Sequence, residues 1–190
     1  MVSFDCNARQ KVIRVKTPPR PAGQSDVLKL RCEPISTVRV GFIGIGSRGL
    51  AAVHRFLSIP GVEIKALCDL ESENLDKARA LLVHAKFPAA QEYSSKNGYK
   101  EICERQDIDL IYICTDWLNH TPIAVYAMEH GKHTAIEVPA AVTLEQCWEL
   151  VNTAEKTRRH CMMLENCCYD RFEMATLNMA QKGLFGRLFM

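Results

Sequence analysis

The sequence lacks the features that several classes of protein depend on. It contains no run of apolar residues long enough to cross a membrane, and its start, MVSFDCNARQKVIRVK, has no apolar core of a secretory signal. Its formal net charge is only +2, and no segment interleaves basic with aromatic residues. We therefore expect a cytoplasmic, unexported protein whose partner is neither a membrane nor a nucleic acid.

Motifs for metal binding and for nucleophilic catalysis are also missing. The nine cysteines are scattered and never spaced Cys-x-x-Cys, and no Walker sequence or nucleophile elbow occurs. Most histidines lie on expected helices or strand starts, without the spacing of metal ligands: His54, His84, His130, His133 and His160. We therefore expect reduced, mostly buried thiols and no metal site.

What the sequence does contain is a regular alternation of strand-like and helix-like segments. Residues 1–36 form a basic, proline-bearing stretch without periodicity, which we interpret as an extended arm. From Val38 on, short apolar runs alternate with stretches of helical period. This pattern is typical of an α/β fold in which crossover helices connect the strands of a parallel sheet.

The expected elements can be located from their apolar runs and capping signals. Thr121 and Pro122 predict the start of a helix that Gly131 ends, and Thr143 with Gln146 forms a capping box for the next helix. Strands are predicted over residues 38–44, 62–68, 109–115, 133–138 and 160–165. Together these elements predict a doubly wound parallel sheet, the Rossmann fold.

The domain organisation follows from the extent of this pattern. We expect a nucleotide-binding domain over residues 37–168, and over residues 169–190 the start of a second, α+β substrate domain. The second segment opens with a predicted helix that ends at Gly183, and it stops in LFGRLFM where another strand begins. A doubly wound sheet binds its ligand outside the carboxyl ends of its strands, which a further element normally covers. We therefore expect this chain to lack most of its substrate domain.

The strongest functional signal is the segment GIGSRG over residues 44–49. It follows an apolar strand and opens an amphipathic helix, which is the context that a dinucleotide-binding glycine motif requires. Gly44 permits the tight turn, Gly46 lets the backbone approach a pyrophosphate, and Gly49 lets helix and strand pack closely. The helix N-terminus adds N–H donors and a positive dipole. The motif therefore predicts a dinucleotide ligand.

Asp69 ends the second predicted strand, twenty residues after Gly49. Its carboxylate is placed to accept hydrogen bonds from the adenosine ribose, where it would repel the extra phosphate of NADP. Alternatively, it caps the helix that begins in LESENLDKA. The upstream glycine motif favours the ribose, and therefore NAD as the cofactor.

Three further polar loops follow strand ends. Trp117 and His120, in the segment TDWLNH, are expected to border the nicotinamide, or alternatively to fix the loop. Glu137 ends the next strand, where a carboxylate is costly unless it has a partner. Asn166 follows the last strand, where a contact with the ribose or carboxamide competes with capping of a turn.

These residues make the sequence similar to a known family. Over residues from about 20 to 186 it resembles the glucose-fructose oxidoreductase and inositol dehydrogenase superfamily, and within it glycoside hydrolase family 109, through GFIGIGSRG, ALCDL, YICTDWLNHTPIAVYAMEHGKH, AIEVPAA and TAEKTRRHCMMLENCCYD. The resemblance implies an NAD-dependent α-N-acetylgalactosaminidase that acts on a carbohydrate. It also implies NAD contacts from Ser47, Arg48, Asp69, Trp117, His120, Glu137, Val138 and Asn166.

The reaction implied by the resemblance is a hydrolysis that borrows redox chemistry. NAD would oxidise the sugar at carbon 3, the ketone would acidify the hydrogen on carbon 2, and elimination would expel the glycosidic group. Water would then add, and NADH would reduce the ketone. Dehydrogenases of the superfamily usually carry Glu-Lys-Pro at positions 137–139, where the lysine assists proton transfer. Val138 cannot move a proton, which favours the glycosidase branch.

The remaining expectations concern the parts outside the nucleotide-binding pattern. Tyr169 is the local candidate for a catalytic base or a sugar contact, and alternatively an aromatic residue that starts a helix. Two other functions stay open: a sugar dehydrogenase with net turnover of NAD, and a non-catalytic NAD-binding fragment. We expect the isolated chain to be inactive. Apolar surface at an uncovered sheet edge would favour a homo-oligomer.

Overall fold

The computed structural model describes residues 3–4, 13–14, 18–165 and 167–186 of the chain. The chain divides into two compact units, of which one is Gly23–Leu164 and the other combines Met1–Ala22 with Glu165–Met190. The first unit contains the parallel sheet. It begins before residue 37, the expected domain start, because part of the arm packs on the sheet and its helices.

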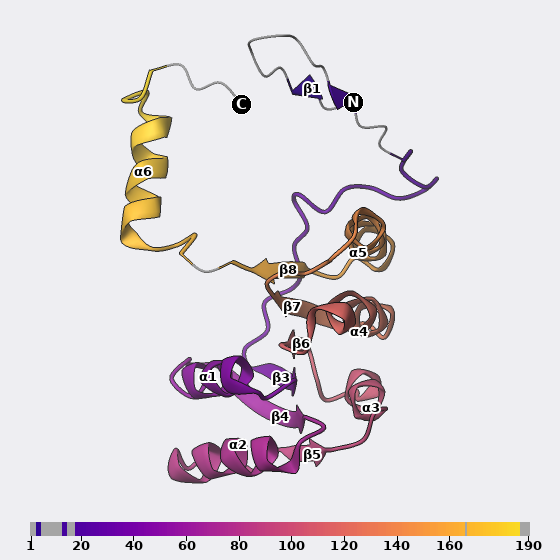
Figure 1. The fold of residues 1–190 in the computed structure, drawn as a ribbon, viewed down its shortest axis with the longest axis vertical. Helices are drawn as coiled ribbons and strands as arrows, with labels where there is room; N and C mark the ends of the chain where they lie inside the picture. The colour runs from indigo at the N-terminus through magenta and orange to yellow at the C-terminus, as the bar shows by residue number, and fades with distance from the viewer. Residues whose placement is uncertain (1–2, 5–12, 15–17, 166, 187–190) are drawn as a thin grey trace. The chain divides into compact units, whose positions relative to one another are not determined.

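The parallel sheet has six strands in the order β5-β4-β3-β6-β7-β8 (Figure 1). All of its strand pairs are parallel. In chain order the strands are β3 (Val38–Ile43), β4 (Val62–Cys68), β5 (Gln91–Tyr93), β6 (Leu110–Ile113), β7 (His133–Glu137) and β8 (Cys161–Leu164). The chain places β4 and β5 on one side of β3 and then returns to place β6, β7 and β8 on the other. This reversal creates a switch point between β3 and β6, and it confirms the predicted doubly wound fold.

Helices cover both faces of the sheet. The helices are α1 (Ser47–Phe56), α2 (Ser72–His84), α3 (Gly98–Glu104), α4 (Trp117–Glu129) and α5 (Leu144–Thr157). Helices α1 and α2 lie on one face, and α3, α4 and α5 lie on the other (Figure 1). Successive residues of β6 therefore enter different cores: Ile111 and Ile113 pack toward α3 and α4, and Tyr112 packs with Phe42 on the α1 side. Among the described residues, no helix is both long and apolar enough to cross a membrane.

Helix α4 begins earlier than the sequence predicted. The Asp116 side chain accepts a hydrogen bond from the Leu118 N–H at 3.1 Å, which caps a helix that starts at Trp117. The expected start at Thr121 is therefore wrong, since the Thr121 hydroxyl instead donates to the Ala140 carbonyl at 2.9 Å. Pro122 lies inside the helix.

Three other elements show which local sequence signals predict the structure and which do not. The predicted cap by Thr143 is confirmed, since the Gln146 N–H donates to Thr143 Oγ1 at 3.2 Å. The Gln146 side chain accepts the Val142 N–H at 2.9 Å, and not the Thr143 N–H that a complete capping box uses. Strand β5 and helix α3 were not predicted. Strand β5 has only three residues, with no apolar run, and it lies at the edge of the sheet. Helix α3 has only seven residues, which gives too short a window for a helical period.

The described cysteines include both buried and exposed thiols. Cys68 and Cys103 are buried, and burial raises the pKa of each thiol to about 12, which keeps them protonated and unreactive. Contrary to the expectation of mostly buried thiols, four described cysteines are exposed: Cys32, Cys147, Cys167 and Cys168.

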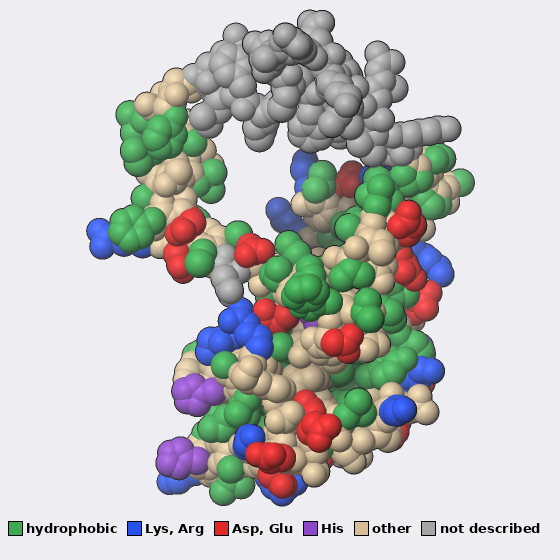
Figure 2. Space-filling view, in the orientation of Figure 1, with side chains coloured by type: hydrophobic (Ala, Val, Ile, Leu, Met, Phe, Trp, Pro, Cys, Tyr) green, Lys and Arg blue, Asp and Glu red, His purple; other side chains and the backbone are tan. Residues whose placement is uncertain are grey.

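The second unit contains a short strand pair and one helix. Strand β1 (Ser3–Phe4) pairs antiparallel with β2 (Ile13–Arg14). Helix α6 (Arg171–Gln181) ends shortly before Gly183, whose φ of +74° is the left-handed exit that the sequence predicted. Phe172 on this helix is 82% exposed, and Figure 2 shows hydrophobic side chains along α6.

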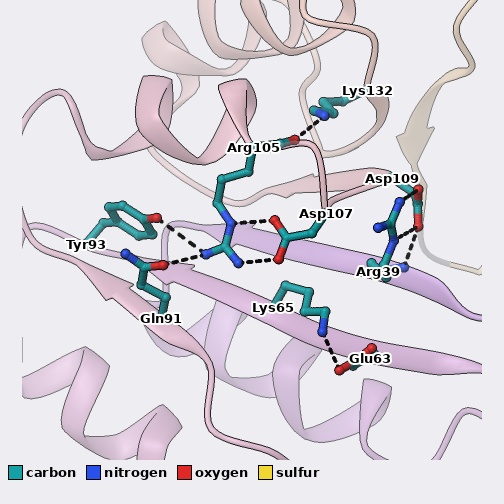
Figure 3. A network of polar contacts seen from close by, with 9 residues as sticks. All are labelled: Arg39, Glu63, Lys65, Gln91, Tyr93, Arg105, Asp107, Asp109 and Lys132. Atoms are coloured by element: carbon teal, nitrogen blue, oxygen red, sulfur yellow. Dashed lines mark hydrogen bonds and ion pairs between the residues drawn. The ribbon is translucent and has the colours of Figure 1, made fainter.

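Ion pairs and hydrogen bonds form a network at the starts of β3 and β6, and Arg105 extends it to Gln91 and Tyr93 of β5 (Figure 3). Arg39 donates from Nε and Nη2 to both carboxylate oxygens of Asp109, at 2.8 and 2.6 Å. Arg105 binds Asp107 in the same two-pronged way, at 2.8 and 2.6 Å. The buried Lys132 ammonium donates to the Arg105 carbonyl oxygen. Paired guanidinium and carboxylate groups of this geometry add both strength and directional specificity.

We predict that Asp109→Asn lowers the free energy of unfolding at pH 7 and flattens its decline in acid. Hydrogen bonds from Arg39 hold the pKa of Asp109 below its ordinary value, against the opposing effect of burial. The unfolded carboxyl titrates near 3.9, so this stabilisation is present above that pH and is lost as the pH falls through the lower folded pKa. Urea unfolding at pH 7 and at about pH 3 measures both effects.

The matched control is Asp76→Asn, which removes an exposed Asp–Arg pair on α2. The Asp76 and Arg79 side chains are 62% and 54% exposed, with an N–O distance of 2.9 Å. An exposed pair contributes little, so we expect a change within about 0.5 kcal/mol. Equal losses for the two substitutions would contradict the role assigned to Asp109.

Candidate functional site

The glycine turn between β3 and α1 is shaped by backbone contacts that leave no room for side chains. Gly44 has a φ of +86°, in the left-handed region, and a Cβ there would lie 2.4 Å from the Cys114 carbonyl oxygen. At Gly49, a Cβ would lie 2.1 Å from the Gly44 carbonyl oxygen. Both positions therefore require glycine if α1 is to leave the sheet this closely, as the motif predicted.

Gly46 has a different reason to be glycine. It is the N-cap of α1, its φ of −60° suits any residue, and a Cβ there would meet no atom within 4 Å. The fold itself therefore does not require glycine at this position. The helix N-terminus instead borders open space in which backbone N–H groups and the helix dipole favour an anion.

A cavity of about 520 Å³ extends from this turn across the carboxyl ends of β3, β4 and β6. Its lining residues are Ile43, Gly44, Gly46, Cys68, Asp69, Leu70, Glu71, Ser95, Lys96, Tyr99, Cys114, Thr115, Asp116, Asn119 and Ile123. The cavity thus lies at the switch point of the sheet and reaches the tip of β4. A long ligand lying in it passes both the glycine turn and Asp69.

The Asp69 carboxylate accepts hydrogen bonds from two loops. Its Oδ2 accepts the Ile45 N–H at 2.6 Å. Its Oδ1 accepts the Glu71 N–H at 2.9 Å and the Asn74 side-chain amide at 3.2 Å. These last two bonds give Asp69 a local role at the start of α2, although the N-cap of that helix is Glu71. Asp69 also lines the cavity, so the local role and a ligand contact are compatible.

Glu137, at the end of β7, has the partners that a buried carboxylate needs. The Tyr112 hydroxyl donates to Glu137 Oε1 at 2.6 Å, and Arg48 Nε lies 3.1 Å from the same oxygen. The Glu137 side chain is 8% exposed and that of Arg48 45% exposed. Burial and the bond to Glu137 raise the pKa of Tyr112, so its hydroxyl stays protonated as a donor. This cluster connects β6, β7 and the first turn of α1.

The loop after β6 is held by His120. This side chain is 1% exposed, with Nδ1 2.7 Å from the Pro139 carbonyl oxygen and Nε2 3.1 Å from that of Thr115. Both partners are carbonyl acceptors, so a ring N–H of His120 donates to at least one of them. His120 does not line the cavity, which supports the alternative that it fixes the loop. Trp117 is 62% exposed and does not line the cavity either.

Two other residues at the start of α4 do reach the cavity. Asn119 and Asp116 both line it, and the Asn119 amide donates to Asp116 Oδ2 at 2.6 Å. This hydrogen bond is the main cause that lowers the pKa of the Asp116 carboxyl, which is therefore ionised at neutral pH.

The remaining candidates lie at different places. Ser47 is exposed in the first turn of α1, and Val138, directly after β7, is 40% exposed. Tyr169 belongs to the second unit and is 77% exposed. Asn166 lies outside the described residues.

Several cavity residues were missed by sequence reasoning. Ser95, Lys96 and Tyr99 line the cavity, but they follow the short edge strand β5, which gave no apolar signal. Tyr112 was missed because it lies within an apolar run, where an aromatic residue is expected to be part of the hydrophobic core. Its hydroxyl has a partner only because β6 and β7 are neighbours in the sheet.

The arrangement fits a dinucleotide. An uncapped helix N-terminus at Gly46, a carboxylate at the tip of β4 and a polar cluster at Glu137 follow one another along the carboxyl edge of the sheet. Within the described ranges, no group of three or more His, Cys, Asp and Glu side chains is placed to hold a metal ion.

Solved structures share this fold. The unit is similar to myo-inositol 2-dehydrogenase from Lactobacillus plantarum, with a TM-score of 0.68 and 21% identity, over 80% of this chain and 43% of that one. It is also similar to the WlbA dehydrogenase from Bordetella pertussis, solved with NADH and UDP-GlcNAcA, with a TM-score of 0.69 and 19% identity, over 80% of this chain and 44% of that one. At these identities the likeness concerns the fold.

Curated relatives are much closer in sequence. The chain is 59% identical over 174 residues to an α-N-acetylgalactosaminidase of Bacteroides fragilis, covering 92% of this chain and 40% of the relative. It is 58% identical over 177 residues to a glycosyl hydrolase family 109 protein of Phocaeicola vulgatus, covering 93% of this chain and 38% of the relative. These similarities confirm the predicted resemblance, and the chain spans about 40% of the length of such relatives.

The family itself is shown by a sequence model. The model described as "Oxidoreductase family, NAD-binding Rossmann fold" matches residues 38–165, which is most of the chain and includes the glycine turn, Asp69 and Glu137. The chain therefore belongs to this oxidoreductase family with an NAD-binding Rossmann fold, and NAD is its cofactor.

Proposed function

We propose that this chain is the NAD-binding part of a glycosidase that cleaves α-N-acetylgalactosaminides. The observation that carries the proposal is the 59% identity over 174 residues to the α-N-acetylgalactosaminidase of B. fragilis. Since the matched region is 40% of that enzyme, most of the sugar-binding groups are assigned to the remainder of the whole protein.

The proposed cofactor position follows the cavity. The pyrophosphate lies on the turn at residues 44–49, where Gly46 leaves space beside the helix N-terminus. Asp69 binds the adenosine ribose. A carboxylate has about four acceptor positions, and the bonds from Ile45, Glu71 and Asn74 leave one for a ribose hydroxyl. Its negative charge disfavours the additional phosphate of NADP.

The nicotinamide end of the cofactor is assigned to the polar cluster of Arg48, Tyr112 and Glu137. Arg48 and Glu137 contact the cofactor, and Tyr112 positions the Glu137 carboxylate by the hydrogen bond of 2.6 Å. His120 acts on the cofactor site by holding the first turn of α4, which carries Asn119. Further contacts are proposed from the family resemblance for Ser47, Trp117, Val138 and Asn166.

The chain's residues suit a reaction without net oxidation. When bound, NAD supplies a hydride acceptor at the sugar and returns the hydride in the same cycle. Val138 offers no proton-transferring group at the position where dehydrogenases of the superfamily usually carry lysine, which favours hydrolysis over dehydrogenation. Tyr169 is proposed as a base or sugar contact.

A chimera tests the proposed activity. We predict that this chain, joined to the part of the B. fragilis enzyme beyond the matched region, releases p-nitrophenol from p-nitrophenyl α-N-acetylgalactosaminide without accumulating NADH. The hydrogen on carbon 2 leaves during the elimination, so product formed in D₂O carries deuterium there, which mass spectrometry detects.

The unmodified B. fragilis enzyme is the control for that assay. A folded chimera that binds NAD but cleaves no glycoside would refute the glycosidase assignment. Accumulation of one NADH per sugar would show a dehydrogenase instead.

The substitution Gly46→Ala tests the pyrophosphate position without disturbing the fold. We predict that it leaves the unfolding midpoint of the cofactor-free chain within a few degrees of the original. A Cβ there meets no protein atom within 4 Å but projects where the pyrophosphate is proposed. NAD affinity, measured by calorimetry, should fall at least tenfold.

Gly49→Ala is the matched comparison. Its Cβ would lie 2.1 Å from the Gly44 carbonyl oxygen, so this variant should lose stability before any question of binding arises. If Gly46→Ala binds NAD as the original chain does, the proposed pyrophosphate position is wrong.

Asp69→Asn tests the ribose contact and the choice of cofactor. We predict that the ratio of NAD affinity to NADP affinity falls at least tenfold, because the substitution removes the charge that repels the 2′-phosphate but keeps an acceptor oxygen. Glu71→Gln is the control, since Glu71 lines the same cavity. Equal changes in both variants would show that the general charge of the cavity, rather than Asp69, sets the preference.

A further inference from the structure

A second cavity lies at the opposite ends of the strands from the cofactor site. It has a volume of about 680 Å³, and its polar lining consists of Lys29, Arg31, Glu33, His133, Arg158 and Arg159. His133 is the first residue of β7, whereas the cofactor cavity adjoins the last residues of β3 and β4. Since the strands are parallel, one cavity lies at their carboxyl ends and the other at their amino ends.

The wall of this cavity is strongly basic. Lys29, Arg31, Arg158 and Arg159 line it, against the single carboxylate of Glu33. This imbalance contrasts with the whole chain, whose formal net charge is only +2. Figure 2 likewise shows acidic and basic side chains mixed over the visible face of the sheet unit. The positive charge is therefore a local property of this cavity.

Arg159 carries a buried nitrogen, its Nε, for which no hydrogen-bond partner exists among the described residues. By contrast, the guanidinium groups of Arg39, Arg79 and Arg105 in the same unit all bind carboxylate oxygens, at distances of 2.5 to 2.9 Å. A guanidinium nitrogen left unpaired inside a protein is costly, which indicates that a ligand oxygen completes its bonding.

Arg158 has a structural role, because its side chain binds the N-terminal arm. Its φ of +55° is left-handed, which is unfavourable for a residue with a side chain. Its Nη1 donates to the Ser25 and Asp26 carbonyl oxygens at 2.8 and 3.1 Å and to Ser25 Oγ at 3.1 Å. These bonds hold the arm against the end of α5, and the following arm residues form one wall of the cavity.

His133 offers a neutral donor. Its Nδ1 accepts the His160 N–H at 3.0 Å, so the neutral ring carries its proton on Nε2. Burial above all, and then the electrostatic influence of the neighbouring His160 and Arg159, lower the pKa of His133, which keeps its ring neutral near pH 7. The ring can thus give one hydrogen bond to a ligand without adding to the charge.

We propose that this cavity binds a multivalent oxyanion, a phosphate or pyrophosphate group, between Arg159, Arg31 and Lys29. The cavity has several cations and only one carboxylate, that of Glu33. This excess of positive charge favours a ligand with several negative charges over a ligand with a single carboxylate group. Guanidinium groups match the oxygen geometry of phosphate with paired hydrogen bonds. This site is separate from the pyrophosphate position at the glycine turn and does not depend on the proposed glycosidase activity.

The test is calorimetric titration of inorganic pyrophosphate into the chain at saturating NAD, which occupies the glycine turn. We expect one binding event whose affinity weakens as the salt concentration rises. Arg159→Gln and Arg31→Gln should each weaken pyrophosphate binding at least tenfold and leave NAD binding unchanged. Arg31 is exposed, so its variant should fold normally even if Arg159→Gln loses stability.

Arg171→Gln is the matched control, because it makes the same change at an exposed position on α6, outside the cavity. It should bind pyrophosphate as the original chain does. The proposal is overturned if pyrophosphate fails to bind beside NAD, or if Arg31→Gln and Arg171→Gln have equal effects. Either result would mean that the basic residues only neutralise the carboxyl-terminal end of α5.

Discussion

The close approach of α1 to the sheet is the constraint on which the rest of the cofactor site depends. The chain turns so tightly after β3 that Gly49 lies against the Gly44 carbonyl, and Gly44 lies against the backbone directly after β6. This contact points the start of α1 at the switch point of the sheet. It also brings Arg48 to the end of β7, where it meets Glu137. Larger residues at either glycine would move the helix, the open N-terminus and the arginine together.

The fold was predictable wherever burial left a pattern in the sequence. Strands β3, β4, β6 and β7 are apolar because helices cover both faces, and their predicted ranges agree with the structure to within two residues at each end. Strand β5, with Gln91 and Glu92 at the sheet edge, carries no such pattern. The start of α4 was misplaced because Thr121 and Pro122 look like an N-terminus, whereas the cap that forms is Asp116.

The site was predictable only in part, for a related reason. The glycine motif and Asp69 can be identified because turn geometry and strand ends are local properties. The bond from Tyr112 to Glu137 depends on which strands are neighbours, and the contacts of His120 depend on where the chain runs after β7. Residues 95–99 reach the cavity only because β5 adds to the sheet beside β4. Such contacts belong to the topology rather than to any short segment.

The hydrogen bond from the Ile45 N–H to Asp69 also joins two loops mechanically. Through Glu71 and Asn74, the same carboxylate holds the beginning of α2, so the glycine turn and the tip of β4 keep a fixed separation. A ligand that spans both loops meets a preset spacing and loses little conformational entropy on arrival. Asp69 is therefore a spacer as well as an acceptor, and a longer acid in its place would alter the length of molecule that fits.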